Sequence, residues 1–159
     1  MSTAEITLRP VVAEDDDFLL SVYAGTRAQE MAMVPWTPEQ KDAFVRMQFT
    51  AQKQHYAAQF PGANHDLICV QRTPVGRLYL DRGTDTLSIL DITILQEFRN
   101  RGTGSEILRR IMEEGGASGR AVSINVENFN PSLRLFERLG FQRAEENGFQ
   151  LLMKWQPAN

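Results

Sequence analysis

The segment Arg99–Gly104, of sequence RNRGTG, has the residue types of a site for an anion. It joins a predicted strand, residues 86–95, to an amphipathic helix that begins at Thr103. Glycines at such a junction let the backbone approach a ligand closely, and the first N–H groups of a helix have no intrahelical acceptor. Together with the helix dipole and the charges of Arg99 and Arg101, these groups predict a site for phosphate.

Three kinds of phosphate-binding loop have glycines near this spacing. A P-loop requires Lys and then Ser or Thr after its second glycine, whereas Ser105 and Glu106 follow Gly104. A dinucleotide fingerprint requires a third glycine, where this chain has Ile107. The third pattern, Arg/Gln-x-x-Gly-x-Gly, is the pyrophosphate loop for acyl-coenzyme A, and Arg99–Gly104 matches it at every position. The segment therefore favours acyl-CoA, with an ordinary helix start as the alternative.

Composition limits the classes of protein that could carry this loop. The chain has 159 residues, of which 42% are hydrophobic and 23% charged, as expected for one folded domain over residues 1–159. Its formal net charge of −3 argues against a general nucleic-acid-binding protein. No apolar run is long enough for a transmembrane helix, and no signal peptide is expected. The single cysteine, Cys69, fits a cytoplasmic location, and two histidines without ligand spacing predict no metal site.

Hydrophobic periodicity predicts a mixed α/β fold in the order β-α-α-β-β-β-α-β-α-β-β. The predicted strands are residues 5–11, 66–71, 75–80, 86–95, 121–127, 141–144 and 149–155. Helices are expected from the acidic run 14–17, from Pro38 towards Phe60, over about 103–114 and over 131–139. A turn is expected at Thr73-Pro74, and Gly115-Gly116 is expected to end the third helix. Simple alternation in strand 86–95 places Leu90, Ile92 and Ile94 on one face and Ile89, Asp91 and Thr93 on the other.

A second motif lies about 30 residues after the glycine loop, at residues 130–141 (NPSLRLFERLGF). Asn130 suits an N-cap, Pro131 a first helical turn and Gly140 a left-handed C-terminal cap. Alone, these residues describe only a well-capped helix. With both motifs present in this order, the chain resembles the GNAT superfamily of acyl-CoA-dependent N-acyltransferases over nearly its whole length.

This resemblance implies that acetyl-CoA lies along strand 86–95. Its pantetheine would pair with the backbone near Ile94 and lie close to Asn130, and its pyrophosphate would bind the loop amides. The cofactor-binding residues implied in and after that loop are Arg99, Asn100, Arg101, Gly102, Thr103, Gly104 and Ser105. The chain departs from the family at Phe136, where many members have a tyrosine thought to protonate the departing thiolate. It also has Asn100 where glycine is common, although Asn tolerates left-handed backbone.

The same resemblance places the acceptor amine between strands 86–95 and 121–127. Asp91, Asn125 and Glu127 are the candidate catalytic residues, because polar side chains on covered strands need partners or a cavity. The alternatives are that Asp91 accepts hydrogen bonds from a neighbouring loop and that Glu127 is solvated or bridges to an arginine. A general base must reach the amine and have a suitable pKa, and Glu127 is favoured slightly over Asp91. Asn125 cannot accept the proton and would orient substrate or water. Trp36 and Tyr79 are candidate substrate contacts, with core packing as the alternative for Trp36.

Three classes of function remain open at this point. The first is direct transfer of an acetyl group from acetyl-CoA to a primary amine in a ternary complex. The second is a non-catalytic acyl-CoA-binding sensor or scaffold, which Phe136 and Asn125 favour, and the third, a nucleotide-binding protein, fails the motif tests. The expected acceptor is a small-molecule amine or a peptide or protein amine, with no nucleic-acid or membrane partner. A monomer or homodimer is expected.

Overall fold

The computed structural model describes residues 5–127, 130 and 132–158. The order of helices and strands predicted from the sequence is confirmed. The elements are β1 (Ile6–Pro10), α1 (Asp16–Met33), α2 (Pro38–Gln59), β2 (Asn64–Val70), β3 (Thr73–Arg82), β4 (Thr86–Ile94), α3 (Thr103–Ser118), β5 (Ala121–Glu127), α4 (Leu133–Arg138), β6 (Gln142–Asn147) and β7 (Gln150–Trp155). Short 3-10 turns precede α1 at Ala13–Asp15 and follow β4 at Gln96–Phe98.

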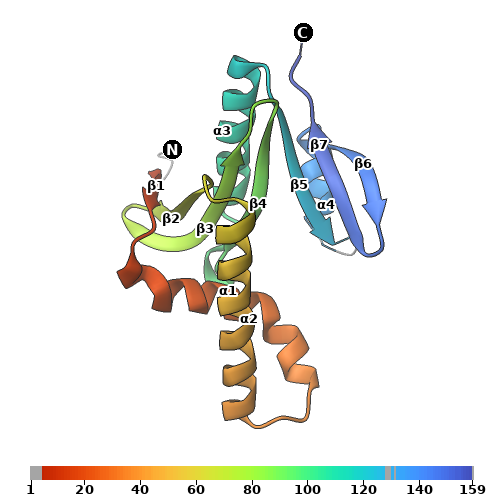
Figure 1. The fold of residues 1–159 in the computed structure, drawn as a ribbon. Coiled ribbons are helices and arrows are strands. Elements are labelled where there is room, and N and C mark those ends of the chain that lie inside the picture. Colours follow the sequence, from red (N-terminus) through yellow and green to blue (C-terminus); the bar gives the residue numbers. More distant parts are fainter. Residues whose placement is uncertain (1–4, 128–129, 131, 159) are drawn as a thin grey trace.

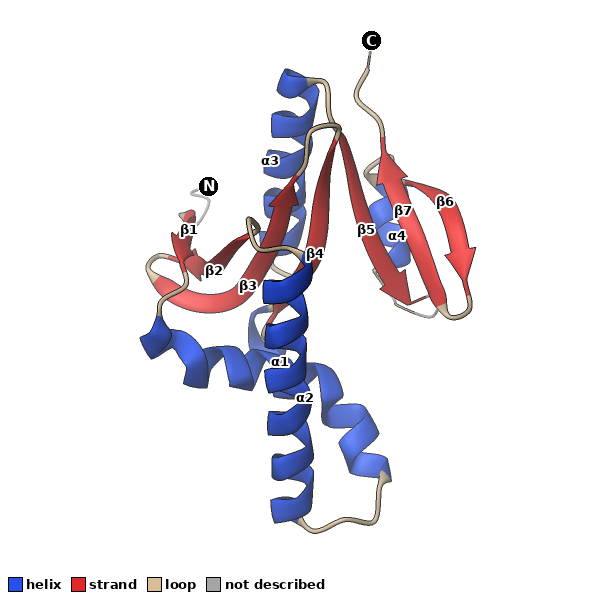
Figure 2. Cartoon of the chain, in the orientation of Figure 1, coloured by secondary structure: helices blue, strands red, loops and turns tan. Residues whose placement is uncertain are grey.

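The strands form one mixed seven-stranded sheet in the order β1-β2-β3-β4-β5-β7-β6. Its pairs are antiparallel except for β4 and β5, which run parallel because α3 crosses between them (Figure 2). This parallel pairing extends only from Thr86–Ala121 to Ile89–Ile124. Beyond it the two strands separate (Figure 2), so that the lower half of β4 faces an opening in the sheet.

Helices cover both faces of the sheet (Figure 1). The apolar stripe of α3, with Ile107, Leu108 and Ile111, packs with α4 and the buried residues of β3–β5 and β7 into the larger core. On the other face, α1 and α2 form a smaller core with Leu67 and Cys69 of β2. A Thr37 cap, whose hydroxyl accepts a hydrogen bond from the Gln40 N–H (3.2 Å), starts α2 at Pro38. The loop end of the α1–α2 pair extends beyond the sheet as an arm (Figure 1).

A β-bulge in β4 overturns the simple alternation expected there. Tyr79 pairs with Asp91 and Leu80 with Ile89, so Leu90 is an extra residue on β4. As a result, Ile89 packs in the same core as Ile92 and Ile94 instead of sharing a face with Asp91. The bulge therefore decides which β4 side chains face the opening in the sheet.

Two predicted boundaries were also wrong. The β2–β3 turn lies at Gln71 and Arg72, which have φ values of 49° and 72°, while Thr73 begins β3. Helix α3 continues past Gly115 and ends at Gly119, whose φ of 70° forms a left-handed cap. Gly115 is buried where a Cβ would lie 2.7 Å from the Arg120 carbonyl oxygen and 3.2 Å from Trp155. Its small size thus serves close packing within the helix. In the described part of the chain, no helix is long and apolar enough to span a bilayer.

Candidate active site

The loop after β4 has the backbone conformation of an anion cradle. Asn100 and Gly102 have φ values of 63° and 80°, which places both in the left-handed region. Within α3, the Glu106 N–H donates to the Gly102 carbonyl (3.0 Å) and closes the first turn. The N–H groups just before Glu106 therefore have no helical acceptor. Because Gly104 would have nothing within 4 Å of an added Cβ, the backbone there is open to a ligand.

The two arginines of this loop have different surroundings. Arg99 lines the groove described below, and its Nε donates to the Ile94 carbonyl oxygen (2.8 Å). Arg101 turns away and donates to the Glu97 carbonyl oxygen (3.2 Å), with its guanidinium 5.5 Å from the centre of the Phe98 ring. Arg101 lies instead at a second cavity, beside Arg109 and Arg110 of α3. Arg99 is thus the loop arginine placed to contact a ligand in the groove.

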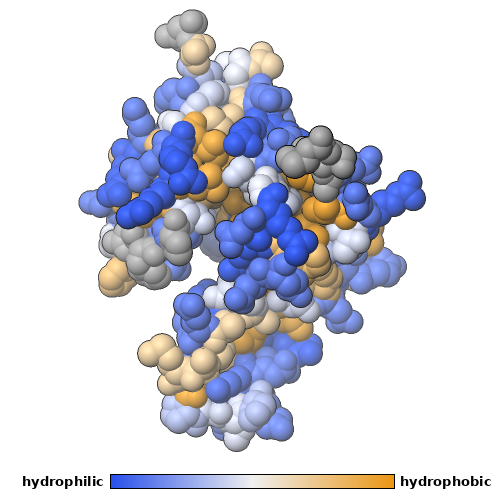
Figure 3. Space-filling view, turned by 180° about the vertical axis from the view of Figure 1, so that it is seen from behind, coloured by the Kyte–Doolittle hydropathy of each residue, from blue (hydrophilic) through white to orange (hydrophobic). Residues whose placement is uncertain are grey.

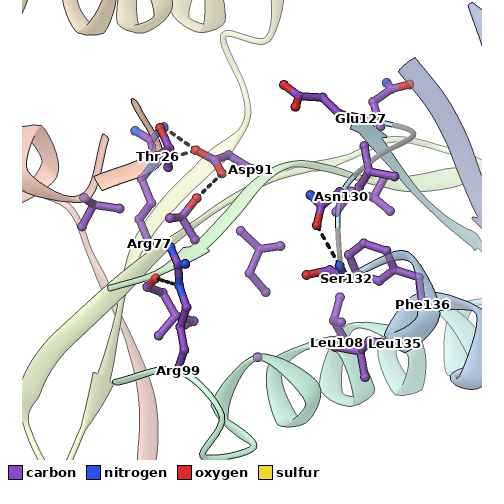
Figure 4. A pocket seen from close by; sticks show the side chains of 18 of the residues that line it. Thr26, Arg77, Asp91, Arg99, Leu108, Glu127, Asn130, Ser132, Leu135 and Phe136 are labelled. Atoms are coloured by element: carbon purple, nitrogen blue, oxygen red, sulfur yellow. Dashed lines mark hydrogen bonds and ion pairs between the residues drawn. The ribbon is translucent and has the colours of Figure 1, made fainter. Parts of the chain in front are cut away.

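A groove of about 920 Å³ extends from this cradle into the opening between β4 and β5. Side chains from α1, α2, β4, β5 and α4 form its walls, and Figure 4 shows several of them converging on it. The predicted site residues that line it are Asp91, Ile94, Arg99, Asn100, Gly102, Thr103, Gly104, Ser105, Asn125, Glu127, Asn130 and Phe136. One continuous space therefore joins the anion cradle to the polar residues of the splayed strands.

Asp91 lies in a hydrogen-bond network on the α2 side of the groove (Figure 4). Its Oδ2 accepts from Arg77 Nε (2.7 Å) and its Oδ1 from the Thr93 hydroxyl (2.7 Å). Arg77 Nη2 also pairs with Asp91 and donates to Gln52 Oε1 on α2 (2.6 Å). Sequence reasoning missed Arg77, although a charged residue inside the apolar run 75–80 was a usable signal.

Glu127 and Asn125 lie on the opposite wall, at the end of β5. Both side chains are exposed and line the groove. In Figure 4, Glu127 lies across the groove from Asp91 and has no drawn partner. The two predicted carboxylates thus face the same space from different strands and with different hydrogen bonding.

Phe136 and Asn130 shape the α4 side. Phe136 is buried (4% exposed), and its ring packs 5.9 Å from that of Phe141 while still lining the groove. Asn130 Oδ1 accepts from the Ser132 N–H (2.8 Å) in the turn before α4. Because α4 begins at Leu133 with Ser132 as its N-cap, the predicted N-cap at Asn130 was wrong. Pro131, which was predicted as the first helical residue, lies outside the described residues. Arg134 and Arg138 of α4 also line the groove and were not predicted.

Trp36 and Tyr79 lie away from the described lining of the groove. Trp36 is 40% exposed near the end of the α1–α2 arm and packs edge-on against Phe44, with 5.2 Å between ring centres. Figure 3 shows hydrophobic atoms gathered at that end of the molecule. Tyr79 lies between His65 and Tyr56, whose ring centres are 4.3 and 4.9 Å away. A substrate contact by either residue remains a prediction.

Burial shifts the pKa values of His65 and Tyr56, whose rings both pack against Tyr79. Desolvation, with the nearby charge of Arg77, lowers the pKa of His65 to about 4. Desolvation, with the negative charge of Asp91, raises the pKa of Tyr56. Both side chains are therefore neutral near pH 7. The charged side chains of α1, β3 and β4 that line the groove are Arg77, Asp91 and the α1 pair Arg27 and Glu30. No cluster of three or more metal-ligating side chains occurs among the described residues.

A comparison with protein-family profiles matches residues 5–142 to the acetyltransferase (GNAT) domain. The chain belongs to the GNAT family. A search of curated protein sequences finds no match. Similar solved structures include the PaiA N-acetyltransferase from Thermoplasma acidophilum in complex with coenzyme A, with a TM-score of 0.72 and 14% identity over 96% of this chain and 99% of that one.

Two further solved structures have a similar fold. An acetyltransferase from Thermus thermophilus has a TM-score of 0.69 and 20% identity over 98% of this chain and 99% of that one. The ribosomal-protein-S18-alanine N-acetyltransferase from Escherichia coli has a TM-score of 0.66 and 15% identity over 98% and 96% of the two chains. At these identities the likeness supports the GNAT fold alone, so substrate has to be argued from the groove.

Proposed function

We propose that this GNAT protein transfers an acetyl group from acetyl-CoA to a primary amine in a ternary complex. The observation that carries the proposal is the continuity of the 920 Å³ groove, which joins the anion cradle to Asp91 and Glu127. An enzyme that acts through a ternary complex needs a donor site and an acceptor site in the same groove, because the acyl donor and the amine must be held next to each other.

The residues of the cradle fit the donor. Open N–H groups at the start of α3 suit a pyrophosphate, and the unobstructed backbone at Gly104 lets it approach. Arg99 adds positive charge at the same place, and Arg134 and Arg138 provide more charge along α4. Leu108, Leu135 and Phe136 give the groove an apolar wall for a pantetheine arm. Acetyl-CoA supplies the activated thioester, and the protein supplies binding and orientation.

Carboxylates on both walls fit an amine. As the new C–N bond forms and the C–S bond breaks, the amine nitrogen must lose a proton and the sulfur must gain one. Glu127 is exposed and faces the groove, so it can accept the amine proton directly or through water. Backbone N–H groups along the opened edge of β4 can polarise the thioester carbonyl. Since Phe136 has no proton to donate, water or the substrate protonates the sulfur in this proposal.

The second candidate is a sensor or scaffold that binds acyl-CoA without turnover. Two observations favour it: the buried phenyl ring at Phe136 and the hydrogen-bonded state of Asp91, which already accepts from Arg77 and Thr93. The acceptor of the enzyme is proposed to be a cationic small-molecule amine or a peptide or protein amine, because carboxylates face the groove. A cytoplasmic location, where donor and acceptor meet, belongs to the same proposal.

Calorimetry combined with a thiol-release assay tests the function. Acetyl-CoA is titrated into the protein, and free CoA is then measured with and without each amine of a panel. Binding together with amine-dependent CoA release is the expected result. Binding without release from any amine would support the sensor, and preferential binding of ATP or NAD over CoA would refute both.

A further inference from the structure

Arg77 is a buried cation beside the acceptor side of the groove. It is 3% exposed, and no other charged residue of the described chain is buried to that degree. Burying a charge is unfavourable unless hydrogen bonds and an opposite charge compensate it. Arg77 has both, through Asp91 and the Gln52 side-chain oxygen. Arg77 of β3 thus places a buried, compensated charge next to Asp91, in the part of β4 that is no longer paired with β5.

Hydrogen bonds from Arg77 and Thr93 hold the Asp91 carboxylate in one orientation. Arg77 Nε donates to Oδ2 and the Thr93 hydroxyl to Oδ1, each at 2.7 Å. A carboxylate offers about four lone-pair sites. Oδ2 faces both Nε and Nη2 of Arg77, whereas Oδ1 accepts only from Thr93 among the described residues, so Oδ1 keeps acceptor capacity. Asp91 lines the groove, with 17% of its side chain exposed. The free capacity is therefore available to an N–H donor in the groove.

The same contacts already engage both oxygens of Asp91. Its Oδ2 faces two nitrogens of the buried Arg77 and its Oδ1 accepts from Thr93, so the carboxylate is held as an acceptor of N–H and O–H groups. Glu127, on the other wall, is exposed, and Figure 4 draws no hydrogen bond or ion pair between it and the described residues shown there. The sequence favoured Glu127 over Asp91 only slightly as the general base. In the structure the two carboxylates differ clearly in exposure and hydrogen bonding.

Helix α2 anchors this arrangement to the bulge in β4. Gln52 accepts from Arg77 (2.6 Å), and the Tyr56 hydroxyl donates to the Leu90 carbonyl oxygen (3.2 Å) at the bulged residue. The Tyr56 contact reaches β4 directly at Leu90, and the Gln52 contact reaches Asp91 of β4 through Arg77 of β3. The orientation of Asp91 is therefore set by α2 as well as by the sheet.

We propose that Arg77 is a positioning residue that holds Asp91 as the carboxylate binding the N–H groups of the acceptor amine, while Glu127 receives its proton. This inference rests on the proposed acetyltransferase function. It separates the two carboxylates by kinetic role: Asp91 acts on the Michaelis constant for the amine, and Glu127 acts on turnover. Arg77 borders the groove but is nearly fully buried, and in this proposal it acts through Asp91.

Steady-state CoA release tests the two carboxylates, with n-butylamine, 1,4-diaminobutane and L-lysine methyl ester as probes. Asp91→Asn keeps an oxygen that can accept from Arg77 but removes its counter-charge, which lowers stability, so thermal unfolding is measured first and the kinetics are compared at a temperature where the variant is folded. It should raise KM for the amine roughly tenfold, because a charge-assisted hydrogen bond is weakened, and should change kcat by less than about threefold. Glu127→Gln should lower kcat by roughly a hundredfold or more, as for loss of a general base. KM for acetyl-CoA should stay the same in both.

Arg77 is tested through its dependence on Asp91. Arg77→Met should raise the amine KM to the level of Asp91→Asn, and Arg77→Lys should restore part of the affinity. The double variant should be no worse than either single one, because both changes remove the same interaction. Arg82→Met is the matched control: Arg82 lies on the same strand and pairs with Glu114 (2.6 Å), far from the groove lining. It should leave both KM values unchanged.

The possible failures are distinguishable. If acetyl-CoA binds but none of the amines releases CoA, the proposed function and this inference are both overturned. If CoA release is normal but Asp91→Asn lowers kcat and removes the acidic limb of the pH profile, Asp91 is the proton acceptor and this inference alone is wrong. Additive effects of Arg77→Met and Asp91→Asn, or an equal effect of Arg82→Met, would show that Arg77 acts only on general structure.

Discussion

Gly104→Ala should separate ligand binding from stability. Gly104 lies in the first turn of α3 and lines the groove, and an added Cβ would meet nothing within 4 Å. The methyl group therefore causes no clash in the free protein. It does project into the space where the proposed pyrophosphate approaches the backbone.

The effect on the free protein should be slightly favourable. Replacing Gly by Ala at a compatible helical position reduces the entropy of the unfolded chain and stabilises a protein by about 0.5 kcal/mol. For a chain of this size, that corresponds to an increase of about 1–2 °C in Tm. Thermal unfolding without ligand measures it.

The effect on CoA binding should be large and opposite in sign. A methyl group that keeps the phosphate from the first N–H groups of α3 removes about one charge-assisted hydrogen bond, worth roughly 1.5–3 kcal/mol. This corresponds to about a tenfold to hundredfold increase in the Kd for CoA. Isothermal titration with CoA and with acetyl-CoA measures the change directly.

Gly116→Ala provides the matched control, because it makes the same substitution in the same helix. Its Cβ would lie 3.8 Å from Trp155, an ordinary contact, at the end of α3 away from the cradle. It should raise Tm in the same way and leave the Kd unchanged. If Gly104→Ala binds CoA as tightly as the wild type, the ligand does not approach the backbone there and the cradle is assigned wrongly.

The remaining predictions concern packing, leaving-group chemistry and pH. Gly115→Ala should lower stability by about 1–3 kcal/mol in denaturant unfolding, because its Cβ would lie 2.7 Å from a backbone oxygen; a neutral result would mean that α3 shifts freely. Phe136→Tyr should leave acetyl-CoA affinity nearly unchanged, since the ring keeps its contact with Phe141; a large loss in calorimetry would show that the ring contacts the ligand differently. Between pH 6.5 and 4 the unfolded chain binds more protons than the folded one, because burial holds the pKa of His65 near 4. The free energy of unfolding should therefore fall as pH falls through that window. The Tm of His65→Gln should decline less steeply with falling pH than that of the wild type. Equal slopes would show that the His65 imidazole is already protonated in the folded state.

Local patterns were sufficient to predict the elements of the fold. The strand and helix periodicities, the Thr37 start of α2 and the glycine loop each depend on residues close together in the chain. Their order was confirmed for that reason. The left-handed backbone at Asn100 follows from the same short-range logic.

Features set by distant residues could not be predicted. The bulge at Leu90 depends on the register between β3 and β4, and it moved Ile89 to the core face. Gly115 looked like a helix end, but its size is required by contacts with Arg120 and Trp155. The left-handed cap at Gly119 ends the helix instead.

In the candidate site, too, features that depend on neighbouring residues could be predicted, and features that depend on distant residues could not. The cradle is one continuous segment, so its residues could be named from sequence alone. The pairing of Asp91 with Arg77 and Gln52 joins three elements and follows from tertiary structure. Trp36 and Tyr79 were chosen by residue type and position, and the described lining of the groove does not include them.

The separation of β4 from β5 also creates an edge strand in the interior of the sheet. On the side facing β5, Leu90–Ile94 have no strand partner among the described residues. The carbonyls of Leu90 and Ile94 accept from the Tyr56 and Arg99 side chains instead. Unpaired edges are templates for association with other chains, and a ligand that binds only the folded state stabilises it by mass action. If the pantetheine amides of acetyl-CoA pair with this edge of β4, bound acetyl-CoA would cover it and oppose self-association of the protein. The resistance of the protein to aggregation would then depend on the concentration of acetyl-CoA.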